Sequence, residues 1–380
     1  MKSQSNTISK ILKNYDLCEY CTGRIISKLV GKSSSKLLGK KYLKKFNKSS
    51  KNKCYICKNI FDSLDSMLSS IYEKSNIIDF RTFNLGLILK PSFLERDDCI
   101  KSKFKIKGIE NIKFDLSKEL AKKISRRTKS KRIMNDPDLF IQANFKNESC
   151  TLRSKPIFIY GRYNKKIRKL SQKQTLCLRC NGVGCHNCNF KGLENIESVE
   201  GKISNFLIKK FDGNRVKINW IGGEDQSSLV LGNGRPFFAK VLSPKKRNRI
   251  LRKSSDLDGV YLSELQKLPE QPKGSIPFKS EVSIIIDTEK AISLTQLTKL
   301  KILENITIHD SSKDKKNTHK RIYKVGYKKL GKTSFVLELF ADGGLPIKSF
   351  IQNSDISPNV SNLLENSCKC KKFDFRNIIV

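Results

Sequence analysis

One acidic pair is a candidate for chemistry because it lies between glycines in a strongly basic chain. Glu224 and Asp225 follow Gly222-Gly223, and the glycine-rich stretch Gly232-Asn233-Gly234 then leads to Arg235. The 380 residues include 76 Lys and Arg against 36 Asp and Glu, a formal net charge of +40. An isolated carboxylate in so cationic a protein suggests action on a polyanion. We therefore expect a glycine hinge that carries the acids, followed by a glycine-rich loop that ends in arginine.

Histidine is scarce, which narrows the chemistry further. Of the three histidines, His186 lies inside a cysteine cluster, and His309 and His319 flank a lysine-rich stretch. Serine–histidine or cysteine–histidine catalysis and histidine-rich catalytic metal sites therefore have few candidates. This composition favours chemistry by a carboxylate.

Two cysteine clusters have the spacing of metal ligands. The first joins two Cys-x-x-Cys motifs, and the second is compressed into twelve residues, where Gly182 and Gly184 permit a sharp turn. Each Cys-x-x-Cys motif supplies two soft ligands to a tetrahedral ion. A redox pair needs only one such motif, and four buried thiols are an improbable reading of this spacing. The candidate ligands are Cys18, Cys21, Cys54 and Cys57 in the first cluster, and Cys177, Cys180, Cys185 and Cys188 in the second.

Both clusters predict structural zinc, one ion or two, because four cysteines leave no open position on the metal. The second is similar to a single unit of the cysteine-rich modules of J-domain chaperones, and could also form a knuckle that touches RNA. The four remaining cysteines have no matching spacing, and we interpret them as ordinary thiols: Cys99, Cys150, Cys368 and Cys370.

The charge and the apolar pattern indicate the class of partner. A strongly positive field attracts phosphate polymers, so nucleic acid is favoured over an acidic protein or a membrane surface. No apolar run approaches the roughly 20 residues of a membrane span, and the first fifteen residues hold no apolar signal-peptide core. Cysteines without a secretory signal fit a reducing compartment. We expect a cytoplasmic protein that has no membrane association.

The first half of the chain has the element order of a small α+β layer. Apolar residues recur at helical spacing over 60–71 and 116–124, and they alternate as in strands over 83–89 and 139–145. A further buried strand is predicted at 157–160. The segment 135–141, Asn-Asp-Pro-Asp-Leu-Phe-Ile, follows a basic run and resembles the THUMP domain of RNA-modifying enzymes.

The second half places the acidic pair at the end of a strand. Ile203 to Phe211 has helical spacing, and Val216, Ile218 and Trp220 alternate as in a strand that leads to Gly222. The next strand is predicted at 238–242. Asp225 would then lie on a loop supported by rigid structure, a common location for catalytic groups.

Several segments together resemble one family, the tRNA pseudouridine synthases of archaea and eukaryotes that modify the T-loop, and in particular the archaeal branch. No one segment is decisive, but together they span nearly the whole chain in the expected order. They are the N-terminal Cys-x-x-Cys motifs; 156–163 with Arg168 and Gln172 leading to the Cys177 cluster; 198–201, Ser-Val-Glu-Gly; 222–237; and 343–348 with Pro358 and Leu363-Leu364.

The resemblance implies a fold and a domain order. The expected class is α+β, with a zinc-binding and THUMP-like RNA-binding N-terminal region and a pseudouridine-synthase core built on a mixed, mainly antiparallel sheet. The expected segments are a zinc module at 1–58, a THUMP-like domain at 59–170, the second zinc knuckle at 171–194 and the catalytic domain at 195–380.

The resemblance also implies the chemistry. Asp225 would be the nucleophile that isomerises uridine to pseudouridine at T-loop positions 54 and/or 55 of tRNA, without an organic cofactor or a catalytic metal. Arg235 would hold the aspartate loop or a phosphate, and Lys348 would pair with Asp225 and keep it ionised. Phe278 is the candidate ring for stacking on the substrate base. The implied partner is tRNA, and no obligate protein partner is evident.

Departures from the family pattern keep alternatives open. Pro346 stands where the family has a substrate-facing tyrosine, the segment 278–282 lacks the tyrosine of a Lys-x-Tyr motif, and 354–357 lacks a Gly-Arg-Thr-like piece. One alternative is therefore a catalytically weakened tRNA-binding protein or RNA chaperone. Another is a DNA-binding zinc protein, in which 232–235 merely binds phosphate.

Overall fold

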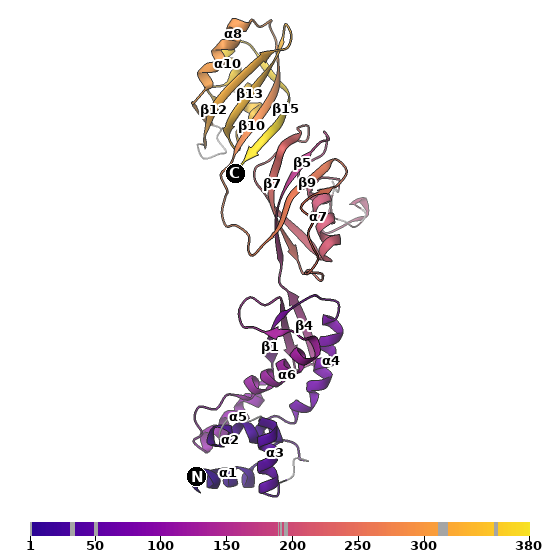
Figure 1. Ribbon diagram of the computed structural model, residues 1–380, viewed down its shortest axis with the longest axis vertical. Helices are drawn as coiled ribbons and strands as arrows, with labels where there is room; N and C mark the ends of the chain where they lie inside the picture. Colours follow the sequence, from indigo (N-terminus) through magenta and orange to yellow (C-terminus); the bar gives the residue numbers. More distant parts are fainter. Residues whose placement is uncertain are drawn as a thin grey trace. The chain divides into compact units, whose positions relative to one another are not determined.

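The computed structural model describes residues 2–30, 35–48, 52–188, 190, 192–193, 197–310, 318–352 and 356–380 (Figure 1). The chain divides into two compact units, one of 1–155 with 245–247 and the other of 156–244 with 248–380. None of the helices in these ranges combines the length and the hydropathy that a bilayer crossing requires. Of the expected departure at 354–357, residues 354 and 355 lie outside the described residues.

The first unit begins with three helices that bury one side each. α2 and α3 approach closely because Gly23 and Gly39 face one another, and a Cβ on Gly39 would overlap the carbonyl oxygen of Glu19. The ion pair of Arg24 with Asp97 ties α2 to α5 in the core. The helices of this unit are α1 Lys2–Asn14, α2 Glu19–Val30, α3 Ser35–Lys45, η1 Ile60–Ser63, α4 Leu64–Ser75, α5 Pro91–Lys103 and α6 Ile112–Thr128.

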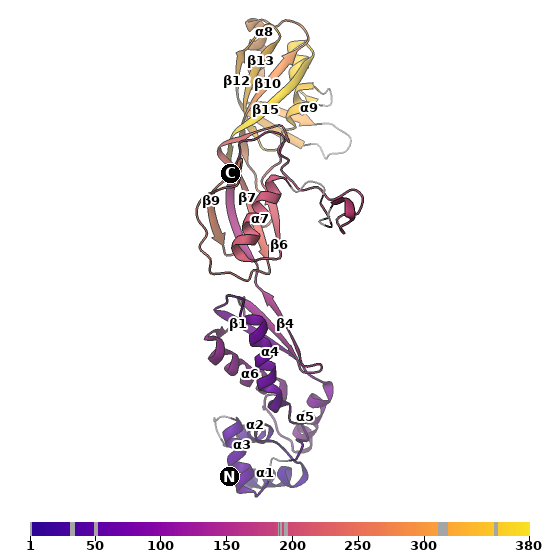
Figure 2. The same ribbon diagram turned by 90° about the vertical axis from the view of Figure 1, so that its right-hand side faces the viewer.

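A four-stranded sheet in the order β2-β1-β3-β4 completes the first unit. β1 runs parallel to β2 and β3, and β4 runs antiparallel to β3. Alternate residues of β1 and β3 are buried, and α4 and α6 pack on this apolar face (Figure 2). The helices and strands predicted at 60–71, 83–89, 116–124 and 139–145 are confirmed. The strands are β1 Thr82–Ile88, β2 Lys131–Arg132, β3 Leu139–Asn144 and β4 Ser149–Ser154.

The second unit is organised around a mixed, mainly antiparallel sheet, so the expected α+β class is confirmed. The strand order is β14-β11-β12-β13-β10-β15-β7-β5-β9-β8, and β6 pairs with β7. β7 and β15 are parallel neighbours joined by one register pair, Val230 with Phe375. The strands are β5 Ile157–Lys165, β6 Arg215–Trp220, β7 Val230–Leu242, β8 Ser255–Asp256, β9 Val260–Leu268, β10 Lys279–Thr288, β11 Thr307–Asp310, β12 Thr318–Lys329, β13 Ser334–Asp342, β14 Ile356–Ser357 and β15 Cys368–Ile379.

Helices flank this sheet. α7 packs on β6 and β7 (Figure 2), and its start is fixed by Ser198, whose side chain accepts a hydrogen bond from the Gly201 amide. The helix predicted at 203–211 and the strands predicted at 157–160 and 216–220 are confirmed. The helices of the unit are η2 His186–Cys188, α7 Val199–Phe211, α8 Leu294–Thr298, η3 Lys299–Leu303, α9 Ile347–Gln352 and α10 Val360–Leu364.

The expectation of a glycine-rich loop at 232–235 is wrong, because these residues lie inside β7. Gly232 and Gly234 have φ of 55° and 74°, a region that favours glycine. A Cβ on Gly234 would lie 2.7 Å from the Tyr163 carbonyl oxygen, and one on Gly232 would overlap that of Arg376. The glycines therefore permit a bulged strand to pass close to its two neighbours, and the sequence pattern of a loop is misleading here.

Candidate active site

Asp225 lies on the connection between β6 and β7, where the sequence predicts it. Its Oδ1 accepts hydrogen bonds from the Ser227 amide at 2.9 Å and the Ser227 hydroxyl at 2.6 Å. Its Oδ2 lies 2.6 Å from Nζ of Lys348, near the start of α9. The structure thus brings together Asp225 and the lysine that the resemblance implies as its partner.

The environment keeps Asp225 ionised and reachable. Partial burial acts to raise its pKa, but the hydrogen bonds from Lys348 and Ser227 outweigh this and lower the pKa to about 2. The side chain of Asp225 is 28% exposed and that of Lys348 is 55% exposed. The arrangement therefore presents a carboxylate that is ionised at neutral pH at the surface of the fold.

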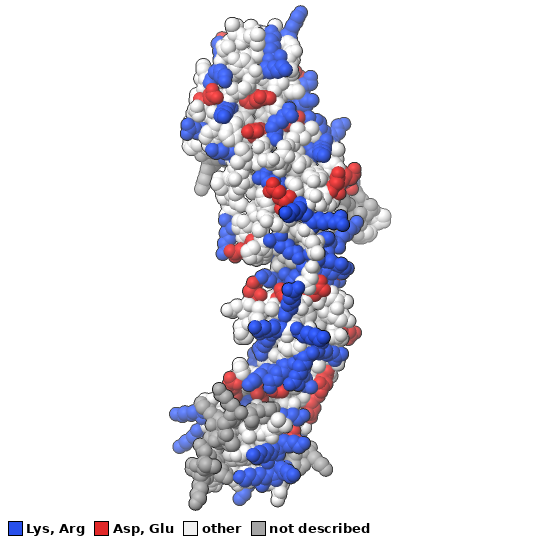
Figure 3. Space-filling view, viewed as in Figure 1, with Lys and Arg blue, Asp and Glu red and all other residues white. Residues whose placement is uncertain are grey.

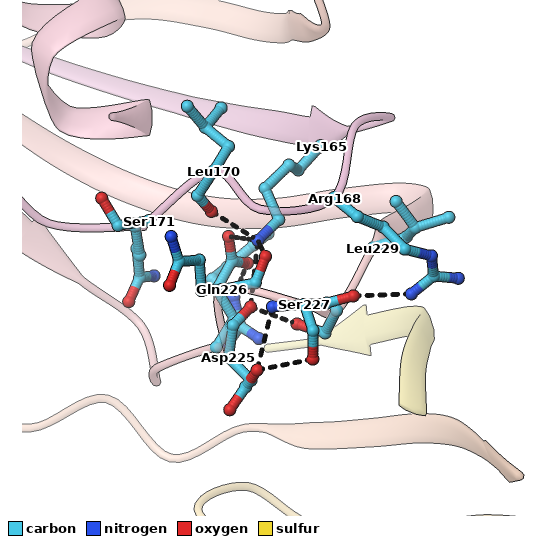
Figure 4. Close-up of polar contacts among 12 residues, drawn as sticks. Lys165, Arg168, Leu170, Ser171, Asp225, Gln226, Ser227 and Leu229 are labelled. Carbon is cyan, nitrogen blue, oxygen red and sulfur yellow. Dashed lines mark hydrogen bonds and ion pairs between the residues drawn. The ribbon is translucent and has the colours of Figure 1, made fainter. Parts of the chain in front are cut away.

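Two basic residues bind the backbone of this loop (Figure 4). Nζ of Lys165 donates to the carbonyl oxygens of Asp225 and Gln226 at 3.0 and 3.4 Å. Nη1 of Arg168 donates to the Ser227 carbonyl at 2.6 Å, and both Nη atoms lie 2.7 Å from the Asp374 carboxylate. Three successive carbonyls of the loop, those of residues 225 to 227, thus accept hydrogen bonds from Lys165 at the end of β5 and from Arg168 just after it.

Glu224 points to the interior, opposite to its neighbour Asp225. Its fully buried carboxylate lies 3.2 Å from Nζ of Lys165 and 3.4 Å from Nε of Arg235, and it accepts a hydrogen bond from the Tyr163 hydroxyl at 2.9 Å. The two acids therefore have separate environments, and Asp225 alone faces solvent.

The structure places Arg235 in the interior as well. Its side chain has no exposed surface, Nη1 donates to the Ile221 carbonyl at 2.9 Å, and its guanidinium lies 4.4 Å from the centre of the Phe375 ring. These contacts connect β7 to the start of the aspartate loop.

A cavity next to the aspartate loop is lined by residues of β7, β10, β13 and β15 and of the segments that adjoin these strands. Phe278 fits there because Gly222 and Gly343 have no side chains, and a Cβ on either glycine would overlap its ring. The lining residues are Gly223, Arg235, Phe278, Ser280, Val282, Leu339, Ala341, Gly344, Leu345, Ile347 and Phe375. The structure therefore places the Phe278 ring against Gly222, three residues before Asp225.

Lys165 is the site residue that the sequence analysis missed, although the sequence carries a signal for it. In β5, Ile157, Ile159, Gly161 and Tyr163 are buried, and Lys165 continues the alternation on the same face. A lysine at an inward position of a strand requires buried partners, which here are Glu224 and the loop carbonyls. Extending the predicted strand by five residues would have identified it.

Both cysteine clusters have a geometry that fits a metal ion. In each cluster one ligand atom from every cysteine lies within 4.8 Å of the others. Sγ of Cys177 is 3.9 Å from that of Cys185, and Sγ of Cys180 is 3.8 Å from that of Cys188. Tetrahedral zinc with bonds of about 2.3 Å requires sulfur separations of about 3.8 Å. The clusters could therefore bind one ion each, in shells closed by four thiolates.

Lys and Arg side chains form many separate patches on the face seen in Figure 3. On α6, Arg126 and Arg127 lie in the last turn, and Arg127 packs on the Tyr72 ring at 4.1 Å. This surface fits a polyanionic partner.

Comparisons with known proteins give a consistent result. The sequence profile of the Pus10 C-terminal domain matches 158–378, and that of the archaeal Pus10 THUMP domain matches 68–144. The tRNA pseudouridine synthase Pus10 of Nitrosopumilus maritimus is 45% identical over 372 residues, which cover 98% of this chain and 97% of that protein. The tRNA pseudouridine synthase Pus10 of Cenarchaeum symbiosum is 30% identical over 371 residues, 97% of this chain and 91% of that protein.

Among solved structures, a chain of a Cbf5–Nop10–Gar1 complex is similar with a TM-score of 0.32 and 9% identity, covering 57% of this chain and 49% of that one. The assignment rests on the sequence matches instead. The match to the Pus10 C-terminal profile extends over more than half of the chain, and the match to the Nitrosopumilus maritimus protein extends over nearly all of it. The chain therefore belongs to the Pus10 family of tRNA pseudouridine synthases, in its archaeal form with a THUMP domain.

Proposed function

We propose that this protein converts uridine to pseudouridine in the T-loop of tRNA, at position 54, 55 or both, with Asp225 as the nucleophile. The observation that carries the proposal is the ionised, partly exposed Asp225 carboxylate, fixed by Lys348 and Ser227 beside a cavity lined by Phe278. Family membership supports the reaction class, and this geometry supports the choice of Asp225.

The chemistry needs no more than such a site provides. Uridine and pseudouridine are isomers: the bond between N1 and C1′ breaks, C5 bonds to C1′, C5 loses a proton and N1 gains one. Neither water, an oxidant nor an organic cofactor enters this balance. Asp225 supplies the nucleophile and Lys348 keeps it charged, so that positioning and electrostatics lower the barrier.

The substrate base must leave the RNA stack to reach Asp225. Phe278 is half-buried between two glycines at the cavity, so its ring is preorganised to contact the extruded uracil. Arg235 is fully buried and bonded to Ile221, which favours a role in holding the aspartate loop over phosphate binding. The basic surface and the THUMP region would dock the tRNA.

The alternative, a catalytically weakened tRNA-binding protein or RNA chaperone, rests on the departures from the family pattern, and Pro346 is one of them. This residue directly precedes α9, its carbonyl accepts the Phe350 amide at 2.8 Å, and Leu345 beside it lines the cavity. Proline suits a helix start, so α9 still presents Lys348 to Asp225. The ion pair is therefore intact without the tyrosine, which supports the enzyme reading.

The proposal is tested on unmodified tRNA incubated with the pure protein. Because pseudouridine has the same mass as uridine, the tRNA is labelled with a carbodiimide that remains on pseudouridine alone, and the added mass is located by mass spectrometry. Pseudouridine should form in the T-loop, and Asp225→Asn should lower the single-turnover rate at least about 10⁴-fold while leaving the Kd for tRNA within about twofold. Asp256→Asn, an exposed aspartate elsewhere in the unit, is the matched control. A folded wild type that binds tRNA and makes no pseudouridine supports the RNA-binding alternative instead.

We also infer that both cysteine clusters bind zinc in a structural role, since four thiolates at tetrahedral separations leave no position for a substrate.

A further inference from the structure

The interior directly behind Asp225 contains a set of buried polar side chains that the reaction itself does not use. Lys165, Glu224, Arg235 and Tyr163 have essentially no exposed side-chain surface. Ionised groups are rarely buried unless they are paired, because an ion loses its hydration when it is removed from water. A group of this kind beside a candidate nucleophile therefore requires an explanation.

The contacts of Lys165 supply one. An ammonium group has three donors, and Nζ of Lys165 lies 3.2 Å from Glu224, 2.9 Å from the Leu170 carbonyl and 3.0 Å from the Asp225 carbonyl. Burial lowers the pKa of Lys165, and the adjacent Glu224 opposes this effect. Two of the three donors thus bind backbone carbonyl oxygens, and one of these two bonds fixes the peptide unit of Asp225 itself.

Glu224 connects this lysine to the other side of the loop. Arg235, which pairs with Glu224, donates to the Ile221 carbonyl at 2.9 Å. Gln172 donates to the Tyr163 hydroxyl at 2.9 Å and to the Gly222 carbonyl at 3.3 Å. The polar group therefore holds residues 221 and 222 before Glu224 and residues 225 and 226 after it.

We propose that Lys165 and Glu224 form a buried positioning pair that fixes the backbone on both sides of Asp225 before tRNA binds. The inference rests on the proposed role of Asp225. Besides the Leu170 carbonyl, Lys165 donates to the carbonyls of Asp225 and Gln226, and a pair that served only to fill the core would not need these two bonds. Two cations beside a single buried carboxylate also leave positive charge behind Asp225, which favours its ionised form.

The proposal is tested first without reference to activity. Hydrogen exchange of the full chain, measured by mass spectrometry, should show exchange of a 226–229 peptide about tenfold faster or more in Glu224→Gln than in the wild type. The Ser227 and Ser228 amides, bonded to Asp225, report this opening, while a peptide from β10 should be unchanged. Unchanged exchange in the loop overturns the proposal, as does an equal increase across the whole unit. Because this readout requires no turnover, it separates the proposal from a failure of the proposed function.

Kinetics supply the second test. Glu224→Gln keeps the shape of the side chain, and the double variant Lys165→Met/Glu224→Gln removes both charges of the pair. Both should lower the single-turnover rate on tRNA by about 10- to 100-fold, since small misplacements cost that much, with the Kd for tRNA changed less than about twofold. Lys166→Met, an exposed neighbour, should match the wild type. Melting temperatures that fall while the rate stays unchanged would assign the pair to the core alone.

Discussion

Asp225 and Glu224 are adjacent in sequence yet have different surroundings, and this difference assigns their roles. Asp225 is 28% exposed and bonded to Lys348 and Ser227, whereas Glu224 is fully buried against Lys165 and Arg235. The sequence could indicate which acid matches the family motif. It could not show that Glu224 is buried, because its partners lie about 60 residues upstream and 11 downstream.

The Lys348–Asp225 pair makes a prediction on pH. The pKa of Asp225 is lowered to about 2, so its carboxylate stays ionised well below pH 4. The stabilisation from its ion pair with Lys348 is therefore lost only as the pH falls through about 2. Lys348→Met removes a cause of this shift, so the pKa of Asp225 should rise. The acid limb of the single-turnover rate should therefore move to higher pH in this variant, with a lower plateau. Rates measured from pH 4 to 7, with exposed Lys369→Met as control, check this; superimposable profiles would count against the pair.

At the scale of elements, strands and helices with regular apolar spacing were predictable, and close backbone approaches were not. The alternation of apolar residues in β1, β3 and β6 predicts each of these strands. The first half of β7 is not predicted from the sequence, because Gly232 and Gly234 break the alternation of apolar and polar residues. Their function is to clear space for Arg376 and Tyr163, two distant carbonyl groups that a single sequence does not reveal.

The crossing of α2 and α3 is a second close approach, and it predicts a stability change. Gly39→Ala should gain about 1 kcal/mol in helix propensity, but its Cβ would overlap the Glu19 carbonyl, so the helices must separate. We expect a net loss of about 1–3 kcal/mol in the unfolding free energy of the first unit. Urea denaturation of the full chain measures it. Gly326→Ala, where the nearest atoms are 3.5 Å away, should stay within about 0.5 kcal/mol of the wild type; equal losses in both would refute this explanation.

At the scale of the whole molecule, composition predicts a polyanionic class of partner, and the spacing of the cysteines predicts the two groups that could bind metal. A charge of +40 and two sets of four cysteines are visible without a structure. The division of the chain was less predictable: β5, which the sequence grouped with the residues before it, pairs with β7 and β9 in the second unit. Such long-range pairing leaves no local signal in the strand itself.

The two cysteine clusters should have different effects on stability. Cys21, Cys54 and Cys57 belong to the apolar core of the first unit, whereas the second cluster lies outside the core of its unit. Cys54→Ser and Cys188→Ser should each remove one zinc ion per chain by elemental analysis. Cys54→Ser should also destabilise the first unit by about 3 kcal/mol or more, and Cys188→Ser should leave that unit unchanged. Cys99→Ser, an exposed thiol, should retain both ions; zinc content unaffected by either cluster variant would exclude the assignment.

The complete burial of Lys165 has a consequence for chemical labelling. Amine-directed acylating reagents reach exposed lysines such as Lys166 directly, but Lys165 has no accessible surface. Its amine can react only when the peptide units of Asp225 and Gln226 move away from it, which is a local opening of the fold. The acylation rate of Lys165 relative to that of Lys166 therefore reports how often the aspartate loop opens. A decrease of this ratio when tRNA is bound would measure how far the substrate closes that loop.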